Sequence, residues 1–254
     1  GDVWAMGAKP QAMLAQITLP RMSEALQAST LREILAAAEE IARETGAPLI
    51  GGHTTQGAEL TLGFTVTGTL SETAKTFDQA RSGDQLILTR PIGSGTLMAA
   101  EMGGTAAGDD IEAVVKEMAT SQAEPAEILA AAAHAMTDVT GFGLAGHVQR
   151  MAAAAGLTAQ INSAAVPHYP GVLHLAEAGV ASTLAPSNRA SLGISLPDTA
   201  AAKLLVDPQT AGGFLAAVPP GQTEQTIRRL ADIGLKPAIV GHLKDWSGQP
   251  LEVI

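Results

Sequence analysis

The chain has 254 residues, a formal net charge of −10 and no cysteine, which excludes disulfides, thiolate metal sites and a cysteine nucleophile within this segment. Its length predicts one large or two medium domains. Lysine and arginine are mostly scattered singly, so we expect no nucleic-acid partner and no membrane partner. No apolar run approaches the ~20 residues that span a bilayer, and the start lacks the basic flank and apolar region of a signal peptide. We therefore expect a cytoplasmic protein.

The first third of the chain predicts strands around one amphipathic helix. Residues 11–19 partly alternate between apolar and polar side chains, as a strand does. Residues 31–46 repeat apolar side chains with helical spacing and end in a glycine. Residues 47–52 and 59–70 are rich in β-branched side chains and predict two more strands. A polar segment follows, and we place a domain boundary near residue 80.

Beyond that boundary, segments typical of strands and of helices are intermixed. Strands are expected at residues 85–90, 157–163, 203–207, 213–218 and 237–243, and helices at 96–102, 110–120, 125–136, 144–156 and 223–234. This mixture indicates an α/β or α+β fold. No fixed sequence period supports a helical repeat.

The segment TDVTGFGLAGH, residues 137–147, carries glycines with the spacing G-x-G-x-x-G. This spacing matches the dinucleotide-binding fingerprint, which also needs a preceding strand and an acidic residue about 20 positions later. The preceding residues 133–140 are a poor strand by pattern, and no acidic residue occurs between Asp138 and Glu177. We therefore do not expect a dinucleotide here.

Asp138 suits a different chemistry. Together with the neighbouring threonines it offers hard oxygen ligands directly before a glycine turn that leads into a helix. Magnesium favours one or two carboxylates plus phosphate oxygens of a substrate, and helix N-termini favour phosphates. The alternative is that Asp138 only caps the helix and the glycines only form a turn. The segment alone leaves both interpretations open.

Three other stretches combine apolar residues with acidic or polar residues and glycines. They are GDVWAMGAKP at residues 1–10, LIGGHTTQGAE at 49–59 and LLVDPQTAGGF at 204–214. Each alone is compatible with an ordinary strand-to-turn junction. Their joint occurrence, in this order and together with DVTGFGLAGH, is more specific.

In that order these motifs resemble selenophosphate synthetase (selenide, water dikinase), of the aminoimidazole ribonucleotide synthetase-like superfamily. The resemblance covers essentially the whole chain. It implies a two-domain fold of α/β and α+β units, with the N-terminal domain truncated in this chain. Residues 1–80 would be a partial ATP-binding and dimerisation domain, whose strands build a barrel with a second copy. Residues 81–254 would be a C-terminal α+β domain.

The family forms selenophosphate from selenide, ATP and water and releases AMP and phosphate. The resemblance implies Asp2 and Asp138 as ligands of Mg2+, with Asp2 also at the ATP site. It further implies that Gly51, Gly52 and His53 contribute to the nucleotide site across the interface of a homodimer. ATP and selenide are thus the expected substrates, and Mg2+ is the expected cofactor.

One departure from the family limits the expected activity. Members carry a cysteine or selenocysteine and an essential lysine before the aspartate that matches Asp2, and this chain starts at that aspartate. No residue of this chain is therefore expected to be catalytic, and the segment alone is expected to be inactive. A module that binds nucleotide or dimerises without chemistry, and a sibling ATP-dependent enzyme, remain the alternatives.

The remaining polar residues are expected to have ordinary roles. Asp207, in the DPQTAGGF motif, is expected to be structural. Each histidine outside the GGH motif is expected to be a surface residue or a core residue with its hydrogen bonds satisfied. Lys9, Arg90 and Arg189 are possible phosphate contacts, although singly placed basic residues are usually solvated.

Overall fold

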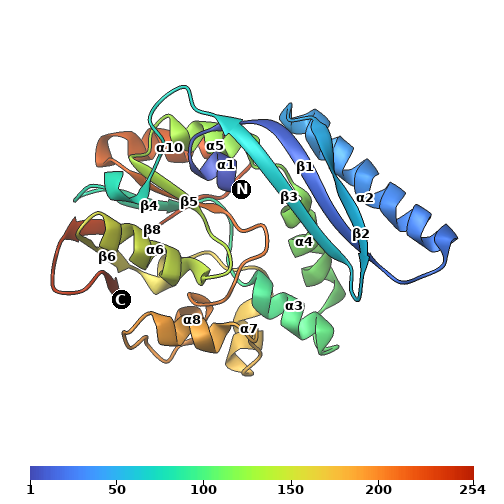
Figure 1. The fold of residues 1–254 in the computed structure, drawn as a ribbon. Coiled ribbons are helices and arrows are strands. Elements are labelled where there is room, and N and C mark those ends of the chain that lie inside the picture. Colours follow the sequence, from blue (N-terminus) through green and yellow to red (C-terminus); the bar gives the residue numbers. More distant parts are fainter. The chain divides into compact units, whose positions relative to one another are not determined.

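The computed structural model describes residues 1–254, shown as a ribbon in Figure 1. The chain forms two compact units, of which the smaller is Gly7–Ala74 and the larger combines Gly1–Met6 with Lys75–Ile254. None of the helices combines the length and the apolar composition that crossing a bilayer requires. The functional division expected at residue 80 stays a prediction.

The smaller unit is a three-stranded sheet with one long helix. It contains β1 (Lys9–Pro20), α2 (Glu24–Thr45), β2 (Leu49–Gly57) and β3 (Thr61–Thr69). The strand order is β2-β1-β3, with β1 parallel to β2 and antiparallel to β3. Because parallel strands need a crossover connection, α2 returns the chain from the end of β1 to the start of β2. Ser23 caps the start of α2 through Leu26 N–H at 3.4 Å, and Gly46, with φ 68°, ends it.

The two faces of this sheet differ. Along β1 the side chains alternate, and Met13, Ala15, Ile17 and Leu19 are buried against α2 or its neighbours. Within this unit no helix covers the opposite face, where Leu14 is 45% exposed. Apart from Leu14 this face is mainly polar, with Gln16, Thr18 and Thr65 on it, and it leaves the sheet accessible to a partner.

The larger unit is built on a six-stranded sheet of order β5-β7-β4-β8-β6-β9. Its strands are β4 (Gln85–Leu88), β5 (Ala135–Asp138), β6 (Leu157–Ile161), β7 (Phe214–Val218), β8 (Ala238–Asp245) and β9 (Leu251–Val253). All neighbouring strands are antiparallel except β6 and β9. Every residue of β7 is buried, which shows that both faces of the central sheet are covered.

Helices cover both faces of that sheet. The helices of the larger unit are α1 (Asp2–Ala5), α3 (Ser94–Met102), α4 (Gly108–Ala119), α5 (Ala123–Ala130), α6 (Gly143–Ala154), α7 (Val172–Glu177), α8 (Ala185–Ser191), α9 (Ala200–Leu204) and α10 (Pro220–Asp232), with short 3-10 turns at Phe77–Gln79 and Ser163–Ala165. One core cluster joins Leu86 and Leu215 to α6 and α7. The other joins Ile87 and Phe214 to α5 and α10.

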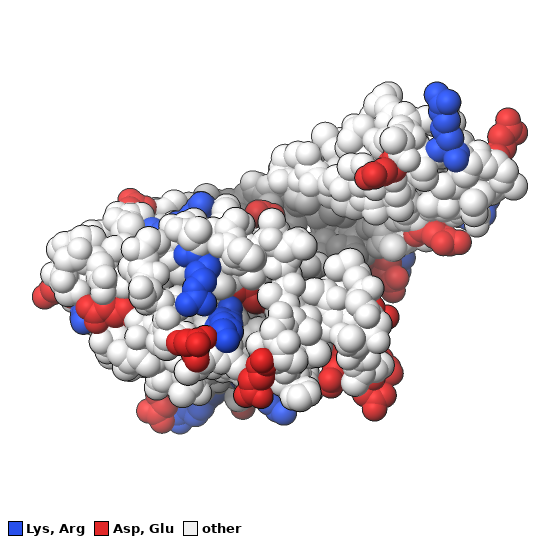
Figure 2. All heavy atoms as spheres, turned by 90° about the horizontal axis from the view of Figure 1, so that it is seen from below, with Lys and Arg blue, Asp and Glu red and all other residues white.

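The face shown in Figure 2 carries its charged side chains singly or in small groups between wide uncharged areas.

Three sequence predictions in this unit are wrong. Residues 203–207 were expected to be a strand, but α9 occupies Ala200–Leu204, because Thr199 caps a run of alanines through Ala202 N–H at 3.2 Å. The poor strand before the glycine motif is β5, and the helix expected at 125–136 ends at Ala130. Pairing of β5 with β7 overrides the helical preference of its alanine and methionine.

Candidate functional site

Asp138 is the last residue of β5, and its carboxylate meets the N-terminal segment of the same unit. A β-carbon added at Gly1 would lie 2.6 Å from Oδ2 of Asp138, so the start of α1 rests against this carboxylate. Burial raises the pKa of Asp138 and the Asp2 carboxylate raises it further, whereas the backbone and the Gly1 ammonium lower it. The two predicted metal ligands are therefore neighbours, and a bound cation would relieve their repulsion.

The loop after Asp138 is fixed by a buried histidine of α6. Nε2 of His147 accepts a hydrogen bond from Thr140 N–H at 3.1 Å, which places the proton of the neutral ring on Nδ1. Nδ1 lies 3.3 Å from the hydroxyl of Thr137, which in turn donates to the backbone oxygen of Asp138 at 3.0 Å. Burial, with a smaller contribution from Arg150, lowers the pKa of His147 to about 4. His147 is thus a core histidine with its hydrogen bonds satisfied, as expected. It contacts Thr137 and Thr140, which lie on either side of Asp138 in the sequence.

The motif glycines serve close packing. Gly143 has φ 70°, and a β-carbon there would lie 2.7 Å from the carbonyl carbon of Val206. A β-carbon at Gly146 would lie 2.9 Å from Cβ of Phe142, which sits one turn earlier. By contrast, a β-carbon at Gly141 would meet nothing within 4 Å. The first glycine of the motif is therefore the one that packing does not require.

The N-terminus of α6 is already partly used by the protein. Ala145 N–H donates to the Leu205 carbonyl at 2.9 Å, and Gly143 N–H donates to Thr140 O at 3.0 Å. The N-cap residue of α6 is Phe142, which makes no side-chain cap. Asp138 is therefore not the helix cap, and its carboxylate is available for another role. This result rules out the simple capping interpretation of Asp138.

Asn188 of α8 connects the glycine loop to the segment before the DPQT motif. Its side-chain amide donates to the backbone oxygen of Gly141 at 2.8 Å and to that of Val206 at 3.0 Å. One side chain thus holds two backbone segments that lie 65 positions apart in the sequence. Side chains of both α6 and α8 therefore hydrogen-bond to the glycine loop.

Side chains of the DPQT motif, distant in sequence, accept hydrogen bonds from the N–H groups at the start of α3. The carboxylate of Asp207 accepts from Gly95 N–H at 3.0 Å and from Thr96 Oγ1 at 2.8 Å. Oε1 of Gln209 accepts from the backbone N–H groups of Gly93 and Ser94 at 3.0 and 3.1 Å. Burial raises the pKa of Asp207, against the lowering effect of these hydrogen bonds. The contacts agree with the structural role expected for Asp207.

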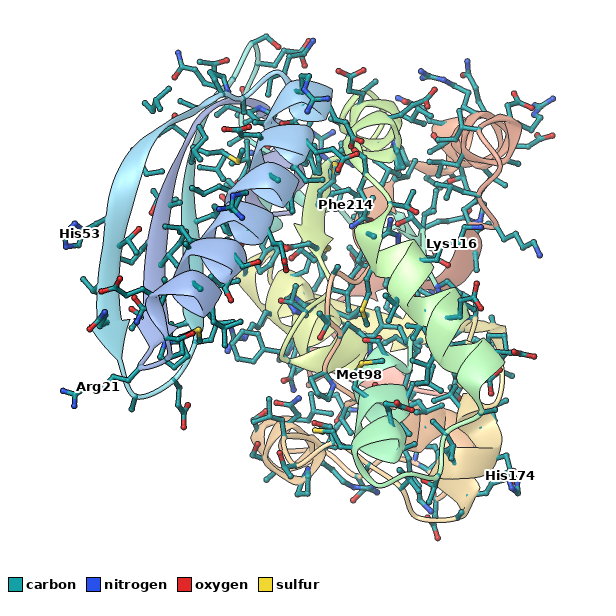
Figure 3. The ribbon with its side chains drawn as sticks, turned by 90° about the vertical axis from the view of Figure 1, so that its right-hand side faces the viewer. Arg21, His53, Met98, Lys116, His174 and Phe214 are labelled. Atoms are coloured by element: carbon teal, nitrogen blue, oxygen red, sulfur yellow. The ribbon has the colours of Figure 1, made fainter.

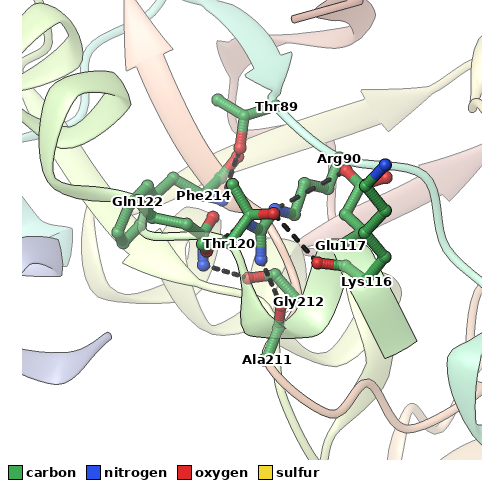
Figure 4. Close-up of polar contacts among 9 residues, drawn as sticks. All are labelled: Thr89, Arg90, Lys116, Glu117, Thr120, Gln122, Ala211, Gly212 and Phe214. Atoms are coloured by element: carbon green, nitrogen blue, oxygen red, sulfur yellow. Dashed lines mark hydrogen bonds and ion pairs between the residues drawn. The ribbon is translucent and has the colours of Figure 1, made fainter. Parts of the chain in front are cut away.

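Arg90 holds the turn that directly follows the DPQT motif, as Figure 4 shows. Its guanidinium donates to Ala211 O at 2.9 Å and to Thr120 O at 2.7 Å, and Nε lies 3.6 Å from a Glu117 carboxylate oxygen. Ala211 is the only non-glycine residue with positive φ, at 47°. Arg90 is 3% exposed, so its guanidinium serves the fold and is not free to meet phosphate.

The GGH residues lie in the smaller unit, on the edge strand β2. Gly51, Gly52 and His53 pair in register with Leu14, Ala15 and Gln16 of β1, and all three are exposed. A β-carbon at Gly52 would overlap the backbone oxygen of Ala15, so only glycine fits there. Figure 3 shows the His53 side chain projecting outward from β2, away from α2. The structure thus leaves these residues accessible to a ligand or a partner.

No group of three or more acidic, histidine or cysteine side chains gathers to hold a metal ion. Asp2 and Asp138 are a pair, and a pair of carboxylates is what Mg2+ uses when substrate phosphates and water complete its six ligands. The oxygen donors therefore fit Mg2+ bound together with a phosphate ligand.

Comparisons with known proteins agree with the motifs. The model of AIR synthase related protein, N-terminal domain, matches residues 1–70, and that of the C-terminal domain matches residues 81–250. Selenide, water dikinase of Pelobacter propionicus is 35% identical over 261 residues, across 100% of this chain and 74% of the relative. The enzyme of the same name from Pseudomonas aeruginosa is 34% identical over 258 residues, with the same coverage. This chain belongs to the selenide, water dikinase family.

Solved structures confirm the fold predicted for this selenide, water dikinase family member. Thiamine-monophosphate kinase from Stenotrophomonas maltophilia matches with a TM-score of 0.74 at 21% identity, covering 99% of this chain and 74% of that one. Hydrogenase maturation protein HypE in complex with ATP matches with a TM-score of 0.73 at 19% identity, covering 99% and 72%. The AIR synthase-like fold is thus shared by proteins of different names.

Two residues that shape the site in this family member escaped sequence reasoning. His147 was grouped with ordinary histidines, although its place ten residues after Thr137, inside the motif, is a usable signal. Asn188 lies in a segment with no recognisable motif, and only the structure shows its two carbonyl partners.

Proposed function

We propose that this chain is the nucleotide- and metal-binding part of an ATP-dependent enzyme that forms selenophosphate from selenide and water, releasing AMP and phosphate in the cytoplasm. The observation that carries the proposal is the proximity of Asp2 and Asp138: α1 contacts β5, and the Asp2 carboxylate raises the pKa of Asp138. The support for selenium chemistry is that relatives matching the full chain are named selenide, water dikinase.

Asp2 and Asp138 would hold Mg2+ against the phosphates of ATP. Bound Mg2+ supplies positive charge that offsets the negative charge of the transferring phosphoryl group. The chain contributes position: α1 brings Asp2 to the end of β5, and His147 fixes the backbone on both sides of Asp138. These contacts would place the two carboxylates near each other before ATP binds.

Gly51, Gly52 and His53 would contact the nucleotide across a homodimer interface. Their exposure on β2 and the uncovered sheet face at Leu14 support this assignment. An edge strand with free backbone groups is also a natural place for a second copy to pair. Light scattering should therefore give a dimer mass at micromolar concentration, and a monomer mass would contradict the dimer.

Calorimetric titration with ATP and Mg2+ tests the site directly. We expect binding that requires Mg2+ and that Asp2→Asn and Asp138→Asn each weaken by about tenfold or more. Asp245→Asn, which removes an exposed carboxylate elsewhere in the larger unit, is the matched control and should bind like the parent chain. Failure of the parent chain to bind, or equal loss in the control, would overturn the site.

The selenium chemistry needs a separate test, because this chain has no cysteine. We expect the 254-residue chain alone to release no AMP from ATP and selenide. A chimera that joins it to the part of the Pelobacter propionicus relative it does not span should release AMP only when selenide is present. Release of ADP without selenide by that chimera would indicate a sibling kinase activity instead.

A further inference from the structure

A pocket in the larger unit opens between α7, α8 and α9. It has a volume of ≈ 340 Å³, within the range of small-molecule sites. Its walls are mostly apolar and include Ala176, Val180, Ala185 and Leu204. The volume and the lining suit a compact molecule with an apolar body.

Two basic side chains line the same pocket. Arg189 on α8 donates to the backbone oxygen of Leu196 at 3.4 Å, and Lys203 on α9 lies 3.0 Å from Asp198. The Asp198 side chain is 88% exposed, so its pair with Lys203 is solvated and easily exchanged. Arg189 and Lys203 thus bring two positive charges to the pocket, and the Asp198 carboxylate near them is open to solvent.

The one carboxylate that lines the pocket, Asp207, has both oxygens occupied by hydrogen bonds from the protein. Oδ1 of Asp207 accepts from Thr96, and Oδ2 accepts from Gly95 N–H and from Nε2 of Gln209. These donors belong to the start of α3 and to the DPQT motif, and they hold the negative charge at a helix N-terminus. Arg189 and Lys203 therefore determine the charge that a ligand meets.

We propose that this pocket binds a small organic monoanion, a short aliphatic carboxylate in chemical class. Its apolar body fills the space between α7, α8 and α9, and its carboxylate meets Arg189 and Lys203. The site is independent of the proposed reaction at Asp2 and Asp138. It shares α8 with that site, because Asn188 on the same helix holds Gly141.

Nuclear magnetic resonance of the 15N-labelled chain tests the proposal with hexanoate as the probe. Hexanoate at about millimolar concentration should shift the amide signals of residues that line the pocket. Hexanamide has nearly the same shape and no charge, and it should bind about tenfold more weakly. Absence of shifts with hexanoate, or equal binding of hexanamide, would overturn the proposal.

Substitutions at the pocket separate charge from shape. Lys203→Gln should weaken hexanoate binding several-fold, whereas Lys203→Arg keeps the charge and should retain it. Lys236→Gln removes an exposed lysine beyond α10 and is the matched control. Ala181→Phe fills the pocket from an exposed position, so it should block binding without disturbing the core. Unchanged binding in both Lys203→Gln and Ala181→Phe would also overturn the site.

Discussion

Nε2 of His147 accepts a hydrogen bond from Thr140 N–H at 3.1 Å, a contact that a protonated imidazole does not make. The pKa of His147 in the folded chain is lowered to about 4, whereas a histidine in an unfolded chain titrates near about 6.5. Between these values the unfolded state binds a proton that the folded state does not. Stability should therefore fall as the pH falls from about 6.5 to about 4, by on the order of 3 kcal/mol in full.

Urea unfolding at a series of pH values measures this effect. His147→Gln removes the titrating group, so its free energy of unfolding should depend less on pH between about 4 and 6.5 than that of the parent chain. His174→Gln, at an exposed position of α7, should keep the parent dependence. Parallel pH curves for the parent and His147→Gln would show that His147 is not the group responsible.

The glycine motif permits a comparison of two glycines that lie two positions apart. Gly143→Ala should destabilise the chain by about 2 kcal/mol or more, because φ is positive and the added carbon meets the backbone of Val206. Gly141→Ala adds its carbon to open space and should stay within about 0.5 kcal/mol. Thermal and urea unfolding of the two variants check the order, and equal losses would contradict the packing explanation.

Removal of the Asn188 amide should cost about 2 kcal/mol, since the carbonyls of Gly141 and Val206 both lose a donor. Asn188→Ala is the change to make, and urea unfolding is the measurement. Ser187→Ala on the same helix removes one exposed hydroxyl and should have little effect. If the two variants unfolded at the same urea concentration, the link between α8 and the glycine loop would carry no stability.

The pairing of Asp2 with Asp138 shows what local sequence can and cannot reveal. Each aspartate was identified by the motif around it, and the motifs also indicated the AIR synthase-like fold. That their carboxylates interact follows from the contact of α1 with β5, elements 130 positions apart. The pattern of apolar residues along the sequence does not reveal a contact between such distant elements. The roles assigned to these residues, and to Gly51, Gly52 and His53, stay predictions until ligand binding is measured.

The strand errors have a similar cause. Residues 135–138 have little strand preference of their own, and β5 exists because Phe214–Val218 pairs with it. Residues 203–207 are apolar enough for a strand, yet the alanines before them and the Thr199 cap extend a helix into them. Strands 85–90, 157–163, 213–218 and 237–243 were predicted correctly, because their own side chains carry a strong β pattern.

Arg90 provides the strongest test of how the DPQTAGGF turn is held. Arg90→Gln leaves the Ala211 and Thr120 carbonyls without their donors and removes the partner of Glu117, so it should cost about 3 kcal/mol. Arg90→Lys keeps the charge, but one ammonium cannot match the planar fork that reaches both carbonyls, so an intermediate loss is expected. Urea unfolding beside the exposed neighbour Lys116→Gln, which should change stability by less than about 0.5 kcal/mol, gives the comparison. Equal stability of Arg90→Gln and Lys116→Gln would mean that the positive φ of Ala211 is held by its own surroundings and not by the guanidinium.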